Sequence, residues 1–227
     1  MDTKEFMLTA FSYGYSSGDV LSEVIDASRK SEEAKLGGSL NDVVQKAMRP
    51  FITPNSRILE LGPGAGSWTR ALLNLVPHGE VHTIDFLDVT KFIDPAEYSN
   101  RLFCHQIAND DYSFLPDNFF DFYFSFGVFV HYGSADRLRL LKKALPKMRA
   151  RGYAVHEYGD WKKLDAYGWD RGGVPEDFKD KPDEEIWWPR NDAHLMAATA
   201  RVAGWNVIAS DLGLFLRDGV IVLSRPG

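Results

Sequence analysis

The sequence predicts an α/β protein with a doubly wound, mainly parallel sheet, and three observations support this. From residue 57 onward, short apolar runs alternate with helical stretches, which is typical of a parallel sheet covered on both faces. The run Ile58–Leu61 stops at a turn with three alternating glycines and passes directly into a helix-forming stretch. A second short strand, 80–84, follows and ends in Asp85. Together these segments form one βαβ unit.

The elements follow in order along the chain. Residues 1–56 form an N-terminal helical and aromatic extension, with helical patterning over 20–35 and a second helix from Ser39 to about Met48. Residues 57–227 form the main domain. Its strands are expected at 57–61, 80–84, 101–105, 121–126, 152–157, 205–210 and 220–223, and its helices at 67–76, 135–149 and 192–203.

One stretch of the main domain, residues 158–191, breaks this alternation. It is rich in Trp, Pro, Gly and Asp and is too long for an ordinary connection between a strand and a helix. Long connections of this kind often carry function. We therefore expect residues 158–191 to be a cap insertion that folds over the functional site.

Composition excludes several classes of protein. The 227 residues carry a formal charge of −6, which argues against a nucleic-acid partner. The single cysteine, Cys104, excludes an internal disulfide and suits a reducing compartment. No apolar run approaches the ~20 residues that span a bilayer, and the N-terminus lacks a signal-peptide core. We expect a cytoplasmic protein without a membrane span; the sequence does not predict its oligomeric state.

The glycine-rich turn predicts a nucleoside site. Gly62, Gly64 and Gly66 place no side chain between the backbone and a ligand, and amides at a helix start are free to bind one. Glu60 would repel a pyrophosphate but can accept hydrogen bonds from an ammonium or a hydroxyl group. Asp85 lies about 20 residues past the glycines, where doubly wound folds place the carboxylate that binds ribose hydroxyls.

The pattern Glu60-x-Gly62-x-Gly64-x-Gly66 with Asp85 resembles the class I S-adenosylmethionine-dependent methyltransferases. The likeness runs from about residue 40 to the C-terminus and is strongest between 57 and 133. It implies a Rossmann-like, seven-stranded sheet with an antiparallel last strand, and S-adenosylmethionine as the cofactor. A dinucleotide oxidoreductase is a less favoured alternative, because its pattern G-x-G-x-x-G places the third glycine one residue later.

A second motif concerns the adenine ring. Asp111-Tyr112 and the following Leu115-Pro116 resemble a family pattern whose acid meets the adenine amino group and whose next backbone amide meets the ring. The resemblance assigns Asp111 and Tyr112 to these roles, although the family has a small residue where Tyr112 stands. Asn109 and Asp110 offer alternative registers, and a turn capped by these acids is the structural alternative.

The chemistry is expected where the fourth and fifth strands end. Small-molecule methyltransferases often carry an apolar residue followed by His beside the methyl donor, and Val130-His131 matches this. His131 is the candidate general base, with helix capping as the alternative; Phe126, just before it, is assigned to the cofactor site. Glu157 either orients the base, holds a substrate hydroxyl or pairs with an Arg. No spacing specifies a metal, so none is expected.

Substrate recognition is expected from the two segments outside the sheet. Tyr13 and Tyr15 lie in the extension, and Trp161, Trp188 and Arg190 lie in the cap. Arg190 either holds a carboxylate or phosphate or forms a surface ion pair. The predicted function is methylation of a small-molecule acceptor, at a hydroxyl of a sugar or natural product. A small-molecule N-methyltransferase and a non-catalytic nucleoside-binding protein are the alternatives.

Overall fold

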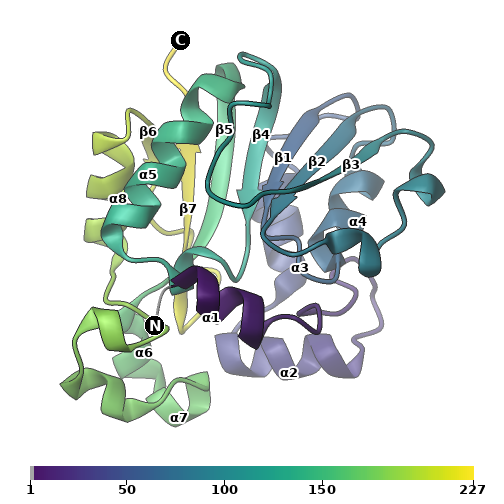
Figure 1. The fold of residues 1–227 in the computed structure, drawn as a ribbon. Coiled ribbons are helices and arrows are strands. Elements are labelled where there is room, and N and C mark those ends of the chain that lie inside the picture. Colours follow the sequence, from purple (N-terminus) through teal and green to yellow (C-terminus); the bar gives the residue numbers. More distant parts are fainter. Residues whose placement is uncertain (1–2) are drawn as a thin grey trace.

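A computed structural model describes residues 3–227 of the chain and shows a seven-stranded sheet with helices on both sides (Figure 1). The strand order is β3-β2-β1-β4-β5-β7-β6. Strands β1 to β5 pair in parallel, whereas β7 pairs antiparallel with both β5 and β6. The predicted fold class, including the antiparallel last strand, is therefore confirmed.

The strands are β1 (Arg57–Leu61), β2 (Glu80–Asp85), β3 (Leu102–Gln106), β4 (Phe120–Ser125), β5 (Met148–Gly159), β6 (Asn206–Ala209) and β7 (Asp218–Ser224). The α-helices are α1 (Thr3–Ala10), α2 (Ala27–Leu36), α3 (Leu40–Asp42), α4 (Ser67–Leu75), α5 (Ser134–Ala144), α6 (Trp161–Tyr167), α7 (Trp169–Gly172) and α8 (Ala193–Val202). A π-helical turn, Val43–Met48, continues α3, and short 3-10 turns lie at Val89–Lys91, Pro95–Tyr98, Phe129–His131, Leu145–Lys147, Glu176–Asp180 and Asp183–Glu185.

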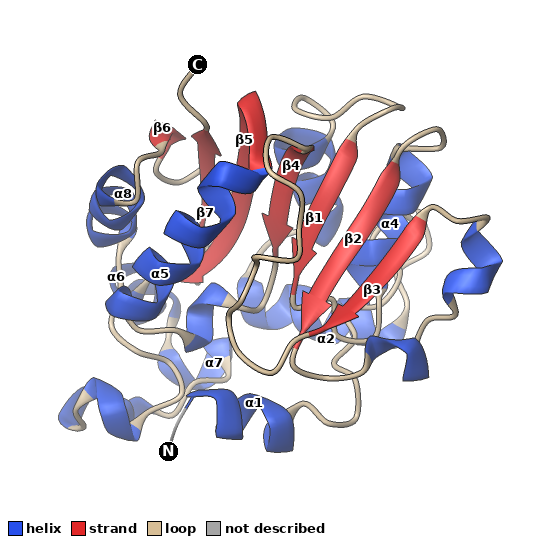
Figure 2. Cartoon of the chain, turned by 45° about the horizontal axis from the view of Figure 1, so that its top comes forward, coloured by secondary structure: helices blue, strands red, loops and turns tan. Residues whose placement is uncertain are grey.

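Two hydrophobic cores cover the two faces of the sheet. Successive side chains of a strand point to opposite faces, so Ile58 joins the core under α2, α3 and α4, and its neighbour Leu59 joins the core under α5 and α8. Figure 2 shows α5 and α8 on one side of the strands and α4 on the other. Leu36 of α2 and Leu40 of α3 are fully buried in the first core. Residues 27–48 thus share one core with the sheet.

The carboxyl ends of the parallel strands face the segments that lie outside the sheet. In Figure 2 the arrowheads of β1 and β2 point toward α1 and α2. The residues between β5 and α8 form α6, α7 and two 3-10 turns around a small core of their own that includes Leu164, Trp169 and Phe178. This core also takes in Val130, which follows β4, so the insertion is packed onto the end of the sheet.

Two boundaries differ from those that the sequence predicts. The helix expected at 135–149 ends at Ala144, because Pro146 cannot donate the next backbone hydrogen bond and the chain tightens into a 3-10 turn. Strand β5 then begins at Met148 and continues to Gly159, so the insertion outside the sheet starts at Asp160. The register of β5 against β4 shifts between Phe120 and Phe122. Among the helices of residues 3–227, none combines the length and apolar character needed to cross a bilayer.

Candidate functional site

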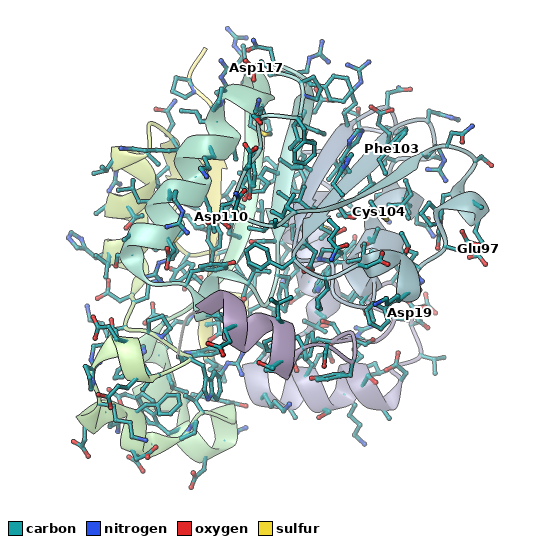
Figure 3. All side chains as sticks on the ribbon, viewed as in Figure 1. Asp19, Glu97, Phe103, Cys104, Asp110 and Asp117 are labelled. Atoms are coloured by element: carbon teal, nitrogen blue, oxygen red, sulfur yellow. The ribbon has the colours of Figure 1, made fainter. Side chains whose placement is uncertain are left out.

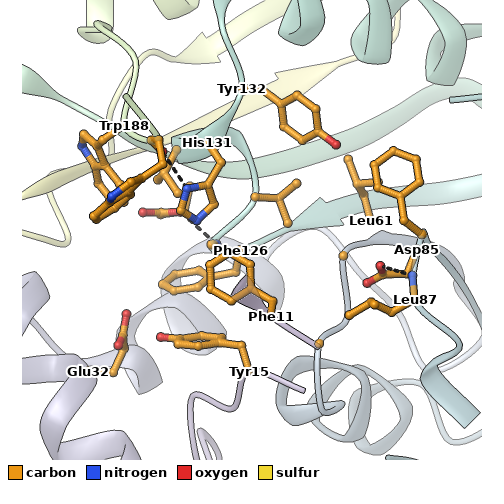
Figure 4. A pocket seen from close by; sticks show the side chains of 18 of the residues that line it. Phe11, Tyr15, Glu32, Leu61, Asp85, Leu87, Phe126, His131, Tyr132 and Trp188 are labelled. Carbon is orange, nitrogen blue, oxygen red and sulfur yellow. Dashed lines mark hydrogen bonds between the residues drawn. The ribbon is translucent and has the colours of Figure 1, made fainter. Parts of the chain in front are cut away.

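A cavity of about 300 Å³ opens at the carboxyl ends of the strands. It is lined by the glycine-rich turn, the ends of β2, β4 and β5, the N-terminal segment, the insertion and the residue before β7. Figure 4 shows Asp85 and Leu87 on one side of this cavity and Glu32, Tyr15 and Trp188 on the other, with Phe11 and Phe126 between them. We call the side with Asp85 the cofactor end and the side with Glu32 the acceptor end.

The glycine-rich turn approaches the cavity in a conformation that other residues avoid. Gly62 and Gly64 line the cavity and have φ angles of 68° and 54°, in the left-handed region that favours glycine. A Cβ atom on Gly62 would lie 2.4 Å from Cγ2 of Val128, and one on Gly64 would lie 2.5 Å from the carbonyl oxygen of Tyr15. Gly66 is the N-cap of α4 and does not line the cavity. Two of the three predicted glycines, Gly62 and Gly64, therefore form a backbone cradle on the cavity wall.

Glu60 lies behind this turn and not on the cavity wall. Its side chain is buried between β1 and α4, where the hydroxyl of Thr69 donates a hydrogen bond of 2.6 Å to Oε2. Burial raises the pKa of Glu60 to about 8, and the nearby charge of Asp85 adds to this. In the structure this carboxyl group fixes the start of α4 against the sheet. Glu60 thus lies one layer behind the backbone of the turn, and its hydrogen bond with a ligand's ammonium stays a prediction.

Asp85 lies on the cavity wall at the end of β2. The amide of Leu87 donates a hydrogen bond of 2.8 Å to its Oδ1. Burial raises the pKa of Asp85 to about 6, and hydrogen bonds from the amides of Leu87, Phe86 and Gly64 oppose the rise. The group is a carboxylate at neutral pH and can accept hydrogen bonds from a pair of hydroxyls. The cradle and this acceptor fit a nucleoside with a ribose.

The adenine motif reaches the cavity through Asp110, the alternative register. Asp110 lines the cavity, and Nε of Arg139 donates a hydrogen bond of 2.9 Å to its carboxylate. Asp111 is exposed, and the amide of Ser113 donates to its Oδ1 at 2.9 Å, as in a capped turn. Tyr112 is buried in the core under α5 and α8. The structure thus separates Asp111 and the Tyr112 side chain from the cavity.

His131 follows β4 and lines the cavity next to Phe126, as predicted from the order of the chain. Its Nδ1 lies 2.8 Å from the carbonyl oxygen of Trp187. A carbonyl only accepts hydrogen bonds, so Nδ1 carries the proton and Nε2 is the basic nitrogen. Burial lowers the pKa of His131 to about 4, which keeps the ring neutral at neutral pH. The N-cap of α5 is Gly133, so His131 does not cap that helix.

Glu157 lies near the end of β5, and the amide of Gly127 donates a hydrogen bond of 2.9 Å to its Oε2. Burial raises the pKa of Glu157 well above its usual range, and the charge of Asp218 raises it further. Arg217 opposes this effect. The guanidinium of Arg217 bonds Asp218 instead, with Nε and Nη2 at 2.9 and 2.6 Å from Oδ2.

Three of the five predicted substrate residues line the cavity, namely Tyr13, Tyr15 and Trp188. Tyr13 is 65% exposed at the rim. Trp161 and Arg190 lie outside the cavity lining. The guanidinium of Arg190 stacks over the Trp161 ring at 4.5 Å and donates to Oδ1 of Asp183 at 2.7 Å. Arg190 therefore forms the surface ion pair that the sequence left as an alternative.

Several residues of the cavity were not predicted. Glu32 and Lys35 belong to α2, and Arg217 directly precedes β7. A local sequence pattern does not mark Glu32, because its helix is far from the sheet ends in the chain and meets them only in the folded protein.

Comparisons with known proteins agree with this geometry. A family model described as a methyltransferase domain matches residues 59–156, which hold the glycine turn, Asp85, Asp110 and His131. No curated protein matches the chain by sequence.

Solved structures with the same fold cover most of the chain. A SAM-dependent methyltransferase from Aquifex aeolicus has a TM-score of 0.61 and 17% identity, covering 88% of this chain and 94% of its own. The PH0226 protein from Pyrococcus horikoshii OT3 has a TM-score of 0.64 and 15% identity, and the match covers 98% of this chain and 99% of the PH0226 chain. The pyocyanin biosynthetic protein PhzM has a TM-score of 0.60 and 15% identity, covering 81% of this chain and 53% of its own. At these identities the likeness to the structures shows the fold.

Proposed function

We propose that this chain, which belongs to the class I S-adenosylmethionine-dependent methyltransferases, methylates a hydroxyl oxygen of a small molecule such as a sugar or a natural product. Its cofactor is S-adenosylmethionine, whose sulfonium supplies an electrophilic methyl group. The observation that carries the proposal is His131, which is buried and neutral on the cavity wall with Nδ1 fixed by the Trp187 carbonyl.

The residues of the cofactor end suit the parts of this nucleoside. Asp85 accepts hydrogen bonds from the ribose hydroxyls, and the backbone at Gly62 and Gly64 receives the amino-acid part without a side chain in the way. Asp110 accepts a bond from the adenine amino group. We assign this role to Asp110 rather than Asp111 because Asp110 alone of the two lines the cavity.

The acceptor hydroxyl is held at Nε2 of His131. Methyl transfer requires the oxygen, the methyl carbon and the sulfur in line, with about 3 Å between the oxygen and the methyl carbon. As the oxygen–carbon bond forms, the hydroxyl proton passes to Nε2, and the electron pair of the breaking carbon–sulfur bond stays with sulfur. With a pKa of about 4, the imidazole is unprotonated and ready to accept this proton at neutral pH.

Glu157 acts as a positioning residue in this proposal. Burial and the neighbouring Asp218 raise its pKa, which disfavours its charged form in the free protein. Its hydrogen bond with the amide of Gly127 holds the segment between β4 and His131. The aromatic walls from Phe11, Phe126 and Trp187 keep water from the reacting groups.

A small acceptor is supported by the size of the cavity, which both ligands share. It is also supported by one structural neighbour, which is by name a pyocyanin biosynthetic protein. An N-methyltransferase is the second candidate, favoured by the carboxyl groups of Glu32 and Glu157 at the acceptor end, which suit an amine.

The test is methyl transfer from methyl-labelled S-adenosylmethionine into a fractionated metabolite extract, followed by mass spectrometry of the labelled product. An ether from the wild-type protein, with loss of its formation in His131→Ala, supports the proposal. A methylated amine that His131→Ala forms at the wild-type rate shows N-methylation instead. A labelled ether that His131→Ala forms at the wild-type rate removes His131 from the reaction.

A further inference from the structure

The proposed function assigns two buried carboxyl groups at the acceptor end no contact with the nucleoside. Glu32 comes from α2 and Glu157 from the end of β5, and both line the cavity. Both residues are enclosed, with 9% and 1% of their surface exposed. Burying a carboxylate is costly unless a positive charge or hydrogen-bond donors compensate it.

The protein's own cations only partly compensate this charge. Arg217 directs Nε and Nη2 to Asp218 and Nη1 to the carbonyl of Gly172 at 2.8 Å, so Asp218 takes its charge. The Nζ atom of Lys35 lies 3.8 Å from Oε2 of Glu32, but 47% of the Lys35 side chain is exposed to solvent. Asp218 thus takes the charge of Arg217, and Glu32 has the partly exposed Lys35 nearby. Burial disfavours the charged form of Glu157, which a positively charged ligand would favour.

Neutral groups within the site orient the two carboxyl groups. Figure 4 shows the Tyr15 hydroxyl directed at the Glu32 carboxylate. The amide of Gly127 bonds Glu157. Both donors are neutral, so they supply no positive charge to these carboxyl groups.

Aromatic rings form the walls around these carboxyl groups. The rings of Trp187 and Trp188 are perpendicular, with centroids 5.6 Å apart, and Phe11 and Tyr15 lie edge to face at 6.1 Å. Ring faces attract cations, and the Trp188 ring already carries the Arg217 guanidinium at 4.7 Å. Carboxylates within aromatic walls form a surface that recognises a positively charged nitrogen.

We propose that the acceptor carries an ammonium group in addition to its reacting hydroxyl, and that Glu32, Glu157 and the surrounding rings bind this group. The acceptor class is thus a hydroxy amine that is charged at neutral pH. This inference rests on the proposed methyl transfer to a hydroxyl. Glu32 and Asp85 lie on opposite sides of the cavity in Figure 4, so the ammonium site and the ribose site are separate.

The test measures binding to the wild-type protein saturated with S-adenosylhomocysteine. The probes are tyramine, its neutral analogue para-ethylphenol and the anion para-hydroxyphenylpropanoate, which share a phenol and differ in the charge of the tail. Calorimetry is expected to show tyramine binding about tenfold more tightly than para-ethylphenol, and the anion most weakly. Equal affinity for tyramine and para-ethylphenol, or no binding of tyramine, overturns the proposal.

Three variants identify the groups responsible. Glu32→Gln removes a charge and keeps the shape, and it is expected to lower tyramine affinity about tenfold without changing para-ethylphenol affinity. Lys35→Gln is expected to raise tyramine affinity. Glu97→Gln is the control for overall charge, because Glu97 is exposed and lies at the outer edge of the molecule in Figure 3. A tyramine affinity that Glu32→Gln leaves unchanged overturns the proposal.

The affinity for S-adenosylhomocysteine separates this inference from the proposed function. If the wild-type protein fails to bind S-adenosylhomocysteine, the proposed function fails. If it binds and tyramine is not preferred, only the present inference fails. If Glu32→Gln lowers the affinity for S-adenosylhomocysteine itself by tenfold, Glu32 holds the cofactor's ammonium, and the inference is wrong about the occupant of this site.

Discussion

The two ends of the cavity are built in different ways. At the cofactor end, Gly62, Gly64, Asp85 and Asp110 follow β1, β2 and β3, within the stretch that the methyltransferase-domain model matches. At the acceptor end, Glu157 lies at the end of β5, and the other residues come from the N-terminal segment, α2, the insertion and the residue before β7. The cofactor end is formed by the sheet and its loops, whereas the acceptor end is formed mostly by segments outside the sheet. Acceptor specificity can therefore change while the cofactor site stays intact.

The two ends also differ in how they stabilise buried charge. Backbone amides of Leu87, Phe86 and Gly64 bond the carboxylate of Asp85, and its pKa stays near 6. Glu157 has one backbone donor and a neighbouring acid, and its pKa rises well above its usual range. The cofactor end is thus ready for its ligand at neutral pH, while the acceptor end gains from a ligand that brings positive charge.

The substitution His131→Ala gives the largest effect and separates the two ends most sharply. Turnover should fall by about 10²- to 10⁴-fold, because the proton acceptor is lost. Affinity for S-adenosylhomocysteine should change less than about twofold, because His131 does not hold the nucleoside. His194→Ala, at an exposed position of α8, is the control and should leave both values unchanged. A parallel loss of nucleoside affinity in His131→Ala would show that the two ends are not separable.

The substitution Asp85→Asn should lower affinity for S-adenosylhomocysteine by about 10- to 100-fold, since charge-assisted hydrogen bonds to the ribose are lost. In the wild-type protein the same affinity should fall as pH drops through about 6, because Asp85 becomes protonated there. The variant should lack this pH dependence. Asp88→Asn, at an exposed carboxylate nearby, is the control. A wild-type affinity that is constant from pH 7 to pH 5 would exclude Asp85 as the ribose ligand.

The substitution Gly64→Ala is expected to affect both ends together. The backbone of Gly64 has a positive φ of 54°, which costs an alanine about 1–2 kcal/mol. The added Cβ atom would also lie 2.5 Å from the carbonyl oxygen of Tyr15. The melting temperature should fall by several degrees, and affinity for S-adenosylhomocysteine by about tenfold. Gly133→Ala is the matched control, because a Cβ at Gly133 meets nothing within 4 Å. A Gly64→Ala variant with wild-type affinity would show that the turn does not contact the nucleoside.

The smallest expected effect concerns which acid, Asp110 or Asp111, binds the adenine amino group. Asp110→Asn should lower affinity for S-adenosylhomocysteine about fivefold, and Asp111→Asn should leave it within twofold, because Asp110 alone lines the cavity. Calorimetry on both variants measures these two affinities for S-adenosylhomocysteine. The reverse order would restore Asp111 as the adenine ligand.

The sequence predicts the parts of the molecule whose signals are local. The strand, turn and helix from Ile58 to Leu75 are contiguous, and each has a strong pattern, so their positions are confirmed. The helix after His131 ends earlier than predicted, because Pro146 has no backbone N–H with which to continue it. The position of Glu60 also has a local signal, because it shares a strand face with Ile58, which packs toward α4.

The rest of the site has no local signal. Glu32 reaches the cavity because α2 packs under the sheet ends, and Arg217 because β7 enters between β5 and β6. The residues that neighbour Glu32 and Arg217 in the chain do not predict where α2 or β7 packs. The choice between Asp110 and Asp111 depends on the direction of a short turn, which backbone hydrogen bonds and Arg139 determine only in the folded protein.

The insertion of β7 between β5 and β6 has a consequence for how the protein is made. β6 leaves the ribosome before β7, and β7 is its only partner strand among residues 3–227. The edge of β5 stays open during that interval, with unpaired backbone groups that other chains can join. The Arg217–Asp218 pair arrives with β7. The nascent chain can therefore complete its nucleoside pocket while its charged acceptor pocket still lacks one wall.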